Sequence, residues 1–181
     1  MTRLKGKRAL IVGASSEGNM GQMMARRFLS EGAAVTVAGR KQAVLDDFAK
    51  ENGATAIACD LTQEDSVNAL VEDAHAAMGG IDIAVNATGW GLLTPFLDNT
   101  REQLEQMTAL QLVGPFQLYQ ALLRKMARSH GGQGGSIIQI SSATAKIMLW
   151  NHAAYMGTKA ATDHIIRCVA NEFGHDGIRA N

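Results

Sequence analysis

The chain has 181 residues, of which 46% are hydrophobic and 19% charged, a composition typical of a folded globular domain. This length allows one hydrophobic core rather than two complete domains. The formal net charge is zero and like charges form no block, which argues against a nucleic-acid partner. No apolar stretch approaches the roughly 18 residues of a membrane span, which argues against a membrane partner.

The first predicted unit is a strand, a glycine-rich turn and a helix. The strand covers residues 7–12, the turn runs from Gly13 to Gly21, and apolar residues then recur at helical spacing until Gly32. Such a turn can receive a pyrophosphate on backbone N–H groups and on the helix N-terminus. It therefore indicates a dinucleotide site, and the lack of a following Lys-Ser or Lys-Thr pair excludes a Walker phosphate loop.

Strands and helices alternate along the rest of the chain. We expect strands at 33–38, 54–59, 81–86 and 136–142, and the start of a sixth at 178–181. Helices are expected at 41–51, 63–78, 100–128 and 152–173. Thr62 is expected to cap the helix at 63–78, and Gly114-Pro115 to interrupt the one at 100–128. This alternation predicts an α/β, doubly wound parallel sheet of the Rossmann type, covered by helices on both faces.

A serine, a tyrosine and a lysine near the fifth strand have spacings suited to proton transfer. Tyr155 and Lys159 are four residues apart on a predicted helix, so their side chains share one face. A nearby ammonium favours the phenolate of a tyrosine, whose ordinary pKa is about 10. Ser142 could donate a hydrogen bond to a carbonyl oxygen on which negative charge develops. Taken alone, a Tyr–Lys pair at this spacing is more often structural, so the assignment depends on the rest of the chain.

These motifs occur together and in a characteristic order. With them the chain resembles the classical short-chain dehydrogenase/reductase family from Gly13 to residues 177–181. The resemblance rests on Tyr155-x-x-x-Lys159, on Ser142 thirteen residues before the tyrosine, on the glycine turn, on Asp60-Leu61-Thr62 and on Asn86-Ala87-Thr88-Gly89.

The resemblance implies a role for each of these residues. Tyr155 would be the general acid in reduction and the base in oxidation, Lys159 would lower its pKa and hold the nicotinamide ribose, and Ser142 would orient the substrate carbonyl. Asn86 resembles the residue that stabilises the sheet centre beside the cofactor, and Asp60 the one that bonds the adenine ring. The other residues expected to hold the cofactor are Gly13, Ser15, Ser16, Asn19, Met20, Gly21, Arg40, Leu61 and Ala87.

The end of the second predicted strand bears on the choice of cofactor. An acidic residue there would bond the ribose 2′-hydroxyl of NAD and repel a 2′-phosphate. This chain has Arg40 and Lys41 instead, and Arg40 could stack on adenine and pair with the phosphate. We therefore expect NADP(H) in preference to NAD(H), against the alternative that both cations are solvated surface charges.

Three positions depart from the family pattern. The glycine turn is two residues longer than usual, and its spacing approaches that of the divergent enoyl reductases, which have a serine where this chain has Asn19. In those enzymes, however, the active-site Tyr and Lys are seven residues apart rather than four. Gln111 replaces an Asn that supports a proton-relay water, so this catalytic position is either rebuilt or weakened. Ala87 replaces a second Asn after Asn86.

Family members continue beyond the sixth strand through a substrate loop and elements that help to build a tetramer. We therefore expect residues 1–181 to form one NAD(P)-binding domain that is incomplete at its C-terminus, and the full-length form to be a homo-oligomer, either a dimer or a homotetramer. The two cysteines and five histidines lack ligand spacing, so we expect no metal site and a reducing, cytoplasmic location.

The predicted substrate is an apolar small-molecule ketone or secondary alcohol. The residues expected to face it follow the fourth and fifth strands, and they are Trp90, Leu92, Leu93, Phe96, Ala143, Thr144, Ile147, Met148, Leu149 and Trp150. Met148 and Trp150 could equally pack against a neighbouring subunit. The expected activity is an NADP(H)-dependent oxidoreductase. The alternatives are a 3-oxoacyl-thioester reductase of the same family and a non-catalytic dinucleotide-binding sensor or scaffold.

Overall fold

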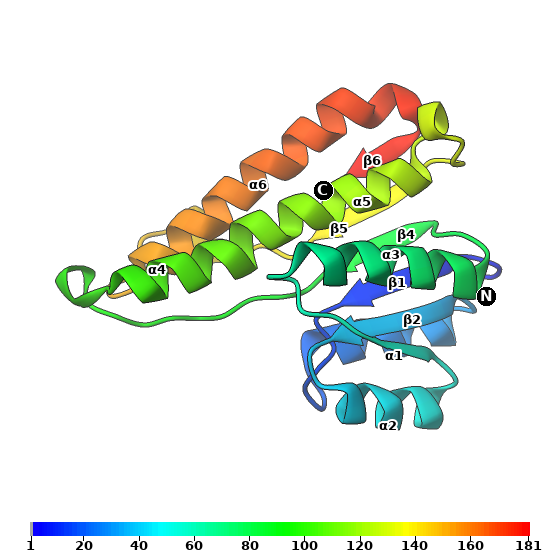
Figure 1. Ribbon diagram of the computed structural model, residues 1–181, viewed down its shortest axis with the longest axis horizontal. Helices are drawn as coiled ribbons and strands as arrows, with labels where there is room; N and C mark the ends of the chain where they lie inside the picture. The colour runs from blue at the N-terminus through cyan, green and yellow to red at the C-terminus, as the bar shows by residue number, and fades with distance from the viewer. Residues whose placement is uncertain (1) are drawn as a thin grey trace.

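A computed structural model describes residues 2–181 and contains a parallel sheet of six strands in the order β3-β2-β1-β4-β5-β6 (Figure 1). The strands are β1 (Arg8–Val12), β2 (Ala34–Gly39), β3 (Thr55–Ala58), β4 (Ile83–Asn86), β5 (Gly135–Gln139) and β6 (Ile178–Ala180). The strand order reverses between β1 and β4, which creates a crevice at their carboxyl ends. The predicted doubly wound fold is confirmed.

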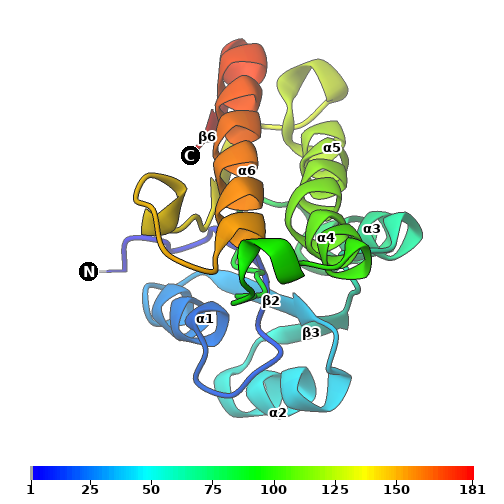
Figure 2. The same cartoon turned by 90° about the vertical axis from the view of Figure 1, so that its left-hand side faces the viewer.

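Helices cover both faces of this sheet (Figure 2). They are α1 (Met20–Ser30), α2 (Gln42–Asn52), α3 (Glu64–Met78), α4 (Arg101–Thr108), α5 (Gly114–Met126) and α6 (Ala153–Phe173). Helices α1 and α2 pack on one face, and α3, α5 and α6 pack on the other. Strand β1 is apolar from Ala9 to Val12 because both of its faces are buried: Ala9 and Ile11 enter the core under α1 and α2, whereas Leu10 and Val12 enter the core on the opposite face.

The predicted interruption of the helix at 100–128 is a change of helical register rather than a break. Helices α4 and α5 form one continuous rod in Figure 1, joined by a π-helical turn at Ala109–Val113. Pro115 stands in the first turn of α5, where its missing N–H is tolerated. A Cβ at Gly114 would lie 2.3 Å from the carbonyl oxygen of Leu61, so glycine allows this rod to approach the loop after β3.

Two predicted boundaries were wrong. The N-cap of α3 is Gln63, whose side chain makes no capping bond, because Thr62 donates from its backbone N and Oγ1 to Asp60 instead (3.0 and 2.8 Å). Strand β5 ends at Gln139 rather than at residue 142, because its pairing with β4 ends there, at the pair Asn86–Gln139. Ser142 instead caps a 3₁₀ turn at Ala143–Ala145. Among residues 2–181, no helix has both the length and the apolarity that crossing a bilayer requires.

Candidate active site

Helix α6 places Lys159 beside Tyr155 at the carboxyl edge of the sheet. The Lys159 Nζ lies 5.9 Å from the centroid of the Tyr155 ring and donates hydrogen bonds to the carbonyl oxygens of Ile140 (3.0 Å) and Thr88 (3.3 Å). The residue is only 3% exposed, and this burial lowers the pKa of its ammonium. Within the described residues no carboxylate oxygen lies within 4.0 Å of Nζ. The Lys159 ammonium therefore lies beside the Tyr155 ring with no close carboxylate to neutralise it.

Ser142 is positioned by the turn that it caps. Its Oγ accepts the backbone N–H of Thr144 (3.2 Å) and lies 2.8 Å from Thr144 Oγ1. The turn at Ala143–Ala145 packs against α6. When Thr144 Oγ1 is the donor of the second bond, Ser142 Oγ keeps its proton and can donate it to a substrate oxygen.

A buried hydrogen-bond network lies behind Lys159 and was not predicted. Gln139 Oε1 accepts from Asn86 Nδ2 (2.8 Å) and from the Tyr119 hydroxyl, while Gln139 Nε2 donates to the carbonyl oxygen of Ile140 (2.9 Å). Asn86 Oδ1 in turn accepts from the backbone N (3.1 Å) and Oγ1 (2.7 Å) of Thr88. The ends of β4 and β5 are thereby fastened together beneath the two carbonyl groups that hold the lysine.

Gln111 lies in the π-helical turn, fully buried, and its amide joins two other segments. Its Oε1 accepts the backbone N–H of Trp90 (3.2 Å), and its Nε2 donates to Thr158 Oγ1 (3.0 Å) and to the Met107 sulfur. A Cβ at Gly89 would lie 3.2 Å from Gln111 Oε1 and 3.6 Å from Lys159 Nζ. The amide and the ammonium thus converge on one small space that a side chain at position 89 would enter.

The glycine turn forms one wall of a cavity of about 180 Å³. Gly13 has φ +104°, and a Cβ there would lie 2.7 Å from the backbone of Ala87. Asn19 caps α1 by accepting from the backbone N of Gln22 (3.0 Å), and its Nδ2 donates to the carbonyl oxygen of Gly13 (2.9 Å). Gln22 Oε1 also accepts the Gly18 N–H (3.0 Å). These hydrogen bonds fix the lengthened glycine turn to the first turn of α1.

Most of the predicted cofactor residues line this cavity. The lining residues are Val12, Gly13, Ser15, Ser16, Asn19, Gly39, Arg40, Cys59, Leu61, Ala87, Thr88, Gly89 and Leu110. Six of the residues predicted to bind the cofactor lie outside the lining: Met20, Gly21, Asp60, Asn86, Tyr155 and Lys159. Asp60 accepts hydrogen bonds from Thr62, which lower the pKa of its carboxyl group. A glycine turn, a helix N-terminus, two serine hydroxyls and a cation fit a dinucleotide with its phosphates.

A second cavity, of about 400 Å³, lies beside the start of α6. Its lining contains four of the predicted substrate residues, Phe96, Met148, Leu149 and Trp150, together with Asn151, His152 and Ala153. The other six predicted residues, Trp90, Leu92, Leu93, Ala143, Thr144 and Ile147, are outside its lining. His152 was not predicted to belong to the site, although its position three residues before Tyr155 was a signal: residues three apart on a helix are neighbours.

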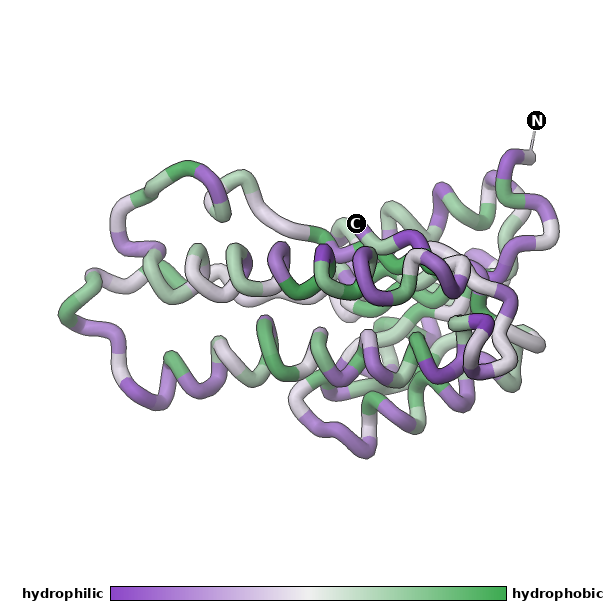
Figure 3. The backbone as a smooth tube through the Cα atoms, turned by 90° about the horizontal axis from the view of Figure 1, so that it is seen from above, coloured by the Kyte–Doolittle hydropathy of each residue, from purple (hydrophilic) through white to green (hydrophobic). Residues whose placement is uncertain are grey.

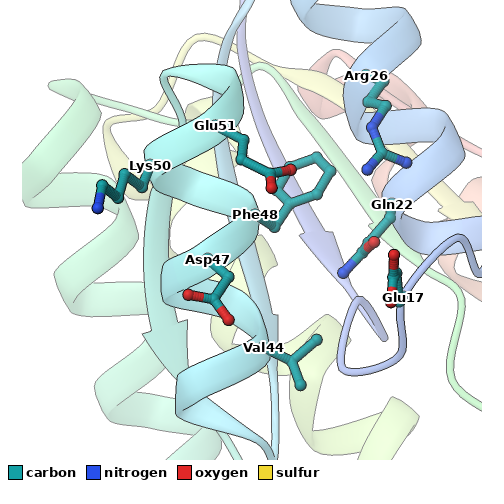
Figure 4. Close-up of a pocket in the computed structure, with 8 residues that line it drawn as sticks. All are labelled: Glu17, Gln22, Arg26, Val44, Asp47, Phe48, Lys50 and Glu51. Carbon is teal, nitrogen blue, oxygen red and sulfur yellow. The ribbon is translucent and has the colours of Figure 1, made fainter.

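Another cavity, of about 540 Å³, lies elsewhere, between α1 and α2 (Figure 4). Charged side chains from both helices line it, and the Arg26 guanidinium lies 5.1 Å from the Phe48 ring. None of the predicted site residues lines this cavity.

Known proteins resemble this chain along its whole length. A protein-family model described as "Enoyl-(Acyl carrier protein) reductase" matches residues 13–181. L-xylulose reductase of Bos taurus is 31% identical over 180 residues, which cover 99% of this chain and 70% of that protein. The uncharacterized oxidoreductase YuxG of Bacillus subtilis is 32% identical, and the match covers 97% of this chain but only 26% of YuxG. The crystal structure of a short chain dehydrogenase from Mycobacterium smegmatis superimposes with a TM-score of 0.95 at 29% identity, covering all of this chain and 77% of that one.

Proposed function

The chain belongs to the classical short-chain dehydrogenase/reductase family, and we propose that it transfers a hydride between NADP(H) and a ketone or secondary alcohol, with Tyr155 as the general acid or base. The observation that carries this proposal is the buried Lys159 ammonium, 5.9 Å from the Tyr155 ring centroid and held by two backbone carbonyl groups.

In reduction, the Tyr155 hydroxyl gives its proton to the carbonyl oxygen of the substrate. Lys159 stabilises the phenolate that this transfer leaves behind, because its positive charge is fixed nearby in a poorly solvated place. Ser142 Oγ donates a hydrogen bond to the same carbonyl oxygen and orients it. The nicotinamide, when bound, supplies the hydride to the carbonyl carbon. In oxidation, the Tyr155 phenolate removes the proton from the alcohol.

Preference for NADP(H) follows from charge at the end of β2. Arg40 lines the cavity beside the glycine turn and stands where an NAD-dependent enzyme would have an acidic residue. A 2′-phosphate would therefore meet a positive charge there instead of a carboxylate. Ser15 and Ser16 line the same wall, and Lys41 donates its backbone N–H to Ser15 Oγ (3.2 Å). A phosphate here would be held by the guanidinium and by hydroxyl groups.

The apolar lining beside α6 supports an apolar ketone as the substrate. The name of the Bos taurus relative, L-xylulose reductase, supports a ketone as the reacting group. A 3-oxoacyl thioester is the second candidate, and its support is the description of the matching family model as an acyl carrier protein reductase. Enoyl reduction itself is disfavoured, because Tyr155 and Lys159 are four rather than seven residues apart. A homotetramer and a cytoplasmic location stay predictions.

The test is NADPH oxidation followed by absorbance over a panel of aliphatic ketones, aromatic ketones and 3-oxoacyl thioesters, with NADH alongside. We expect turnover of ketones with NADPH and slower turnover with NADH at equal concentration. Turnover confined to thioesters would favour the second candidate. NADPH binding without turnover of any substrate would contradict the proposal and favour a sensor or scaffold.

A further inference from the structure

His152 lies between the apolar cavity and Tyr155. It immediately precedes α6, and its side chain makes no capping hydrogen bond to that helix. Its ring centroid is 4.7 Å from that of Tyr155, with the two rings tilted by 55°. The imidazole is thus in direct contact with the proposed proton donor, while the helix end does not use its nitrogens.

The backbone around His152 is held in an unusual conformation. Asn151 has φ +58°, and in residues 2–181 it is the one residue other than glycine with a positive φ. Its carbonyl oxygen accepts the backbone N–H of Thr94 (2.8 Å). This bond joins the two loops that extend past the end of the sheet in Figure 3, and it fixes the point from which the His152 side chain departs.

The hydrogen-bonding capacity of the imidazole is not used by the protein. Nδ1 of His152 is enclosed and has no hydrogen-bond partner in the part of the chain that the structure describes. Buried polar atoms are nearly always paired in native proteins, so such an atom needs an explanation. A neutral imidazole has one donor and one acceptor nitrogen, and rotation about the Cβ–Cγ bond can turn either nitrogen toward a ligand.

The surroundings of His152 indicate what that ligand is. The cavity of about 400 Å³ is lined by Phe96, Met148, Leu149, Trp150 and Ala153, with Asn151 and His152 as its polar residues. A molecule in this cavity therefore meets apolar side chains over most of its surface, and it also meets the imidazole that contacts Tyr155. The arrangement suits an apolar body with a polar group close to the reacting carbon.

We propose that His152 is a specificity-determining residue that binds a second substrate oxygen on the carbon next to the reacting carbonyl. The preferred substrate class is then α-hydroxy ketones and α-diketones with an apolar substituent. This inference rests on the proposed carbonyl reduction at Tyr155. The rings of Tyr155 and His152 are in contact, so these two side chains can bind two oxygens on neighbouring carbon atoms of one substrate. A substrate hydroxyl can donate to the unprotonated nitrogen of the imidazole or accept from the protonated one.

The test compares acetophenone with 2-hydroxyacetophenone, which differ only in the neighbouring hydroxyl. Values of kcat/KM with NADPH are measured for the wild type, His152→Phe, His152→Gln and the control His164→Gln, an exposed histidine of the same helix. We expect the wild type to prefer 2-hydroxyacetophenone by about tenfold, the effect of one well-placed hydrogen bond. His152→Phe keeps a ring against Tyr155 but cannot form the hydrogen bond, so its kcat/KM for 2-hydroxyacetophenone should fall about tenfold more than its kcat/KM for acetophenone. His152→Gln should recover part of the preference.

Binding provides a second readout that does not depend on turnover. Trp150 lines the cavity, so tryptophan fluorescence can follow titration of each ketone into the enzyme saturated with NADP⁺. We expect His152→Phe to weaken binding of 2-hydroxyacetophenone and not that of acetophenone. Equal preference for both ketones in the wild type, or a preference that survives in His152→Phe, would overturn the role of His152 and leave the proposed function intact. Absence of turnover with both ketones and with the whole panel would overturn the two proposals together.

Discussion

Gln139 and Lys159 donate hydrogen bonds to the same acceptor, the carbonyl oxygen of Ile140, over 2.9 and 3.0 Å. The Gln139 amide is held in its orientation by Asn86 and by the Tyr119 hydroxyl, and burial raises the pKa of that phenol, so it stays protonated and donates. We infer that the position of the lysine depends on a buried amide that lies outside the lining of the cofactor cavity.

Replacing Gln139 with Leu should damage stability and catalysis together. The change leaves Asn86 Nδ2 and the Tyr119 hydroxyl without their acceptor, at a cost of about 1–3 kcal/mol for each group that stays unpaired. It also frees the end of β5 to shift, and a small displacement of Lys159 should lower kcat by about tenfold or more. Urea unfolding and steady-state kinetics measure the two effects. Tyr119→Phe removes one donor and keeps the amide, so it should lower the unfolding free energy with a smaller loss of kcat than Gln139→Leu. A larger loss of kcat in Tyr119→Phe than in Gln139→Leu would contradict a positioning role for Gln139.

Cofactor preference should depend on Arg40 and not on its neighbour. Loss of one charge-assisted hydrogen bond, of about 1.5–3 kcal/mol, predicts that Arg40→Gln weakens NADPH binding by about 10- to 100-fold and leaves NADH binding unchanged. Lys41→Gln is the matched control, because Lys41 lies outside the lining of the cavity. Fluorescence titration with both cofactors measures the affinities. Equal losses for NADPH and NADH in Arg40→Gln would show that the residue does not read the 2′-phosphate.

A methyl group at Gly21 should displace the glycine turn. Its Cβ would lie 2.5 Å from the carbonyl oxygen of Gly13, and overpacking of this kind costs about 1–3 kcal/mol. We expect Gly21→Ala to weaken binding of both cofactors by about tenfold or more, whereas Gly91→Ala, which meets no atom within 4 Å, should bind them as the wild type does. Normal cofactor affinity in Gly21→Ala would show that the turn does not hold the dinucleotide.

The Arg8–Asp82 pair should make stability sensitive to acid. Asp82 accepts from the backbone N (2.9 Å), Nε (2.8 Å) and Nη2 (3.0 Å) of Arg8, and these bonds lower the pKa of the Asp82 carboxyl. A carboxyl whose pKa is lower in the folded than in the unfolded chain stabilises the fold above the unfolded value of about 3.9, and this contribution is lost as the pH falls through the folded value.

We therefore expect Asp82→Asn to lose about 1.5–3 kcal/mol of unfolding free energy at pH 7, and the difference from the wild type to shrink below about pH 4. Glu105→Gln removes the exposed Arg101–Glu105 pair of α4 and should change stability by less than about 1 kcal/mol. Urea unfolding between pH 3 and 7 measures both. A difference for Asp82→Asn that is independent of pH would contradict the ionic contribution.

Local patterns in the sequence were sufficient to predict the alternating strands and helices and the doubly wound parallel sheet. The apolar run of β1, the glycines that follow it and the i, i+4 spacing of Tyr155 and Lys159 each depend on neighbours in the chain, and all were read correctly as structure. Competition between hydrogen bonds was harder to predict. Thr62 could cap α3 or bond to Asp60, and the structure shows the second.

Residues whose partners are distant in sequence were missed. Gln139 looked like a polar position in a strand, and its role depends on Asn86 and Tyr119, which are 53 and 20 residues away. His152 was predicted only as the first residue of the helix at 152–173, and its contact with Tyr155 follows the left-handed turn at Asn151. The periodicity of apolar residues does not predict which side chains of different helices and strands meet in the core, nor does it predict a positive φ at a residue other than glycine.

The most direct test of the account is the rate of NADPH oxidation by Tyr155→Phe, measured with a ketone that the wild type reduces. Phenylalanine keeps the ring between His152 and Lys159 and removes only the hydroxyl, so we expect kcat to fall by about 10²- to 10⁴-fold, while NADPH affinity by fluorescence titration stays close to that of the wild type. A variant that binds NADPH normally and retains most of its turnover would contradict Tyr155 as the proton donor.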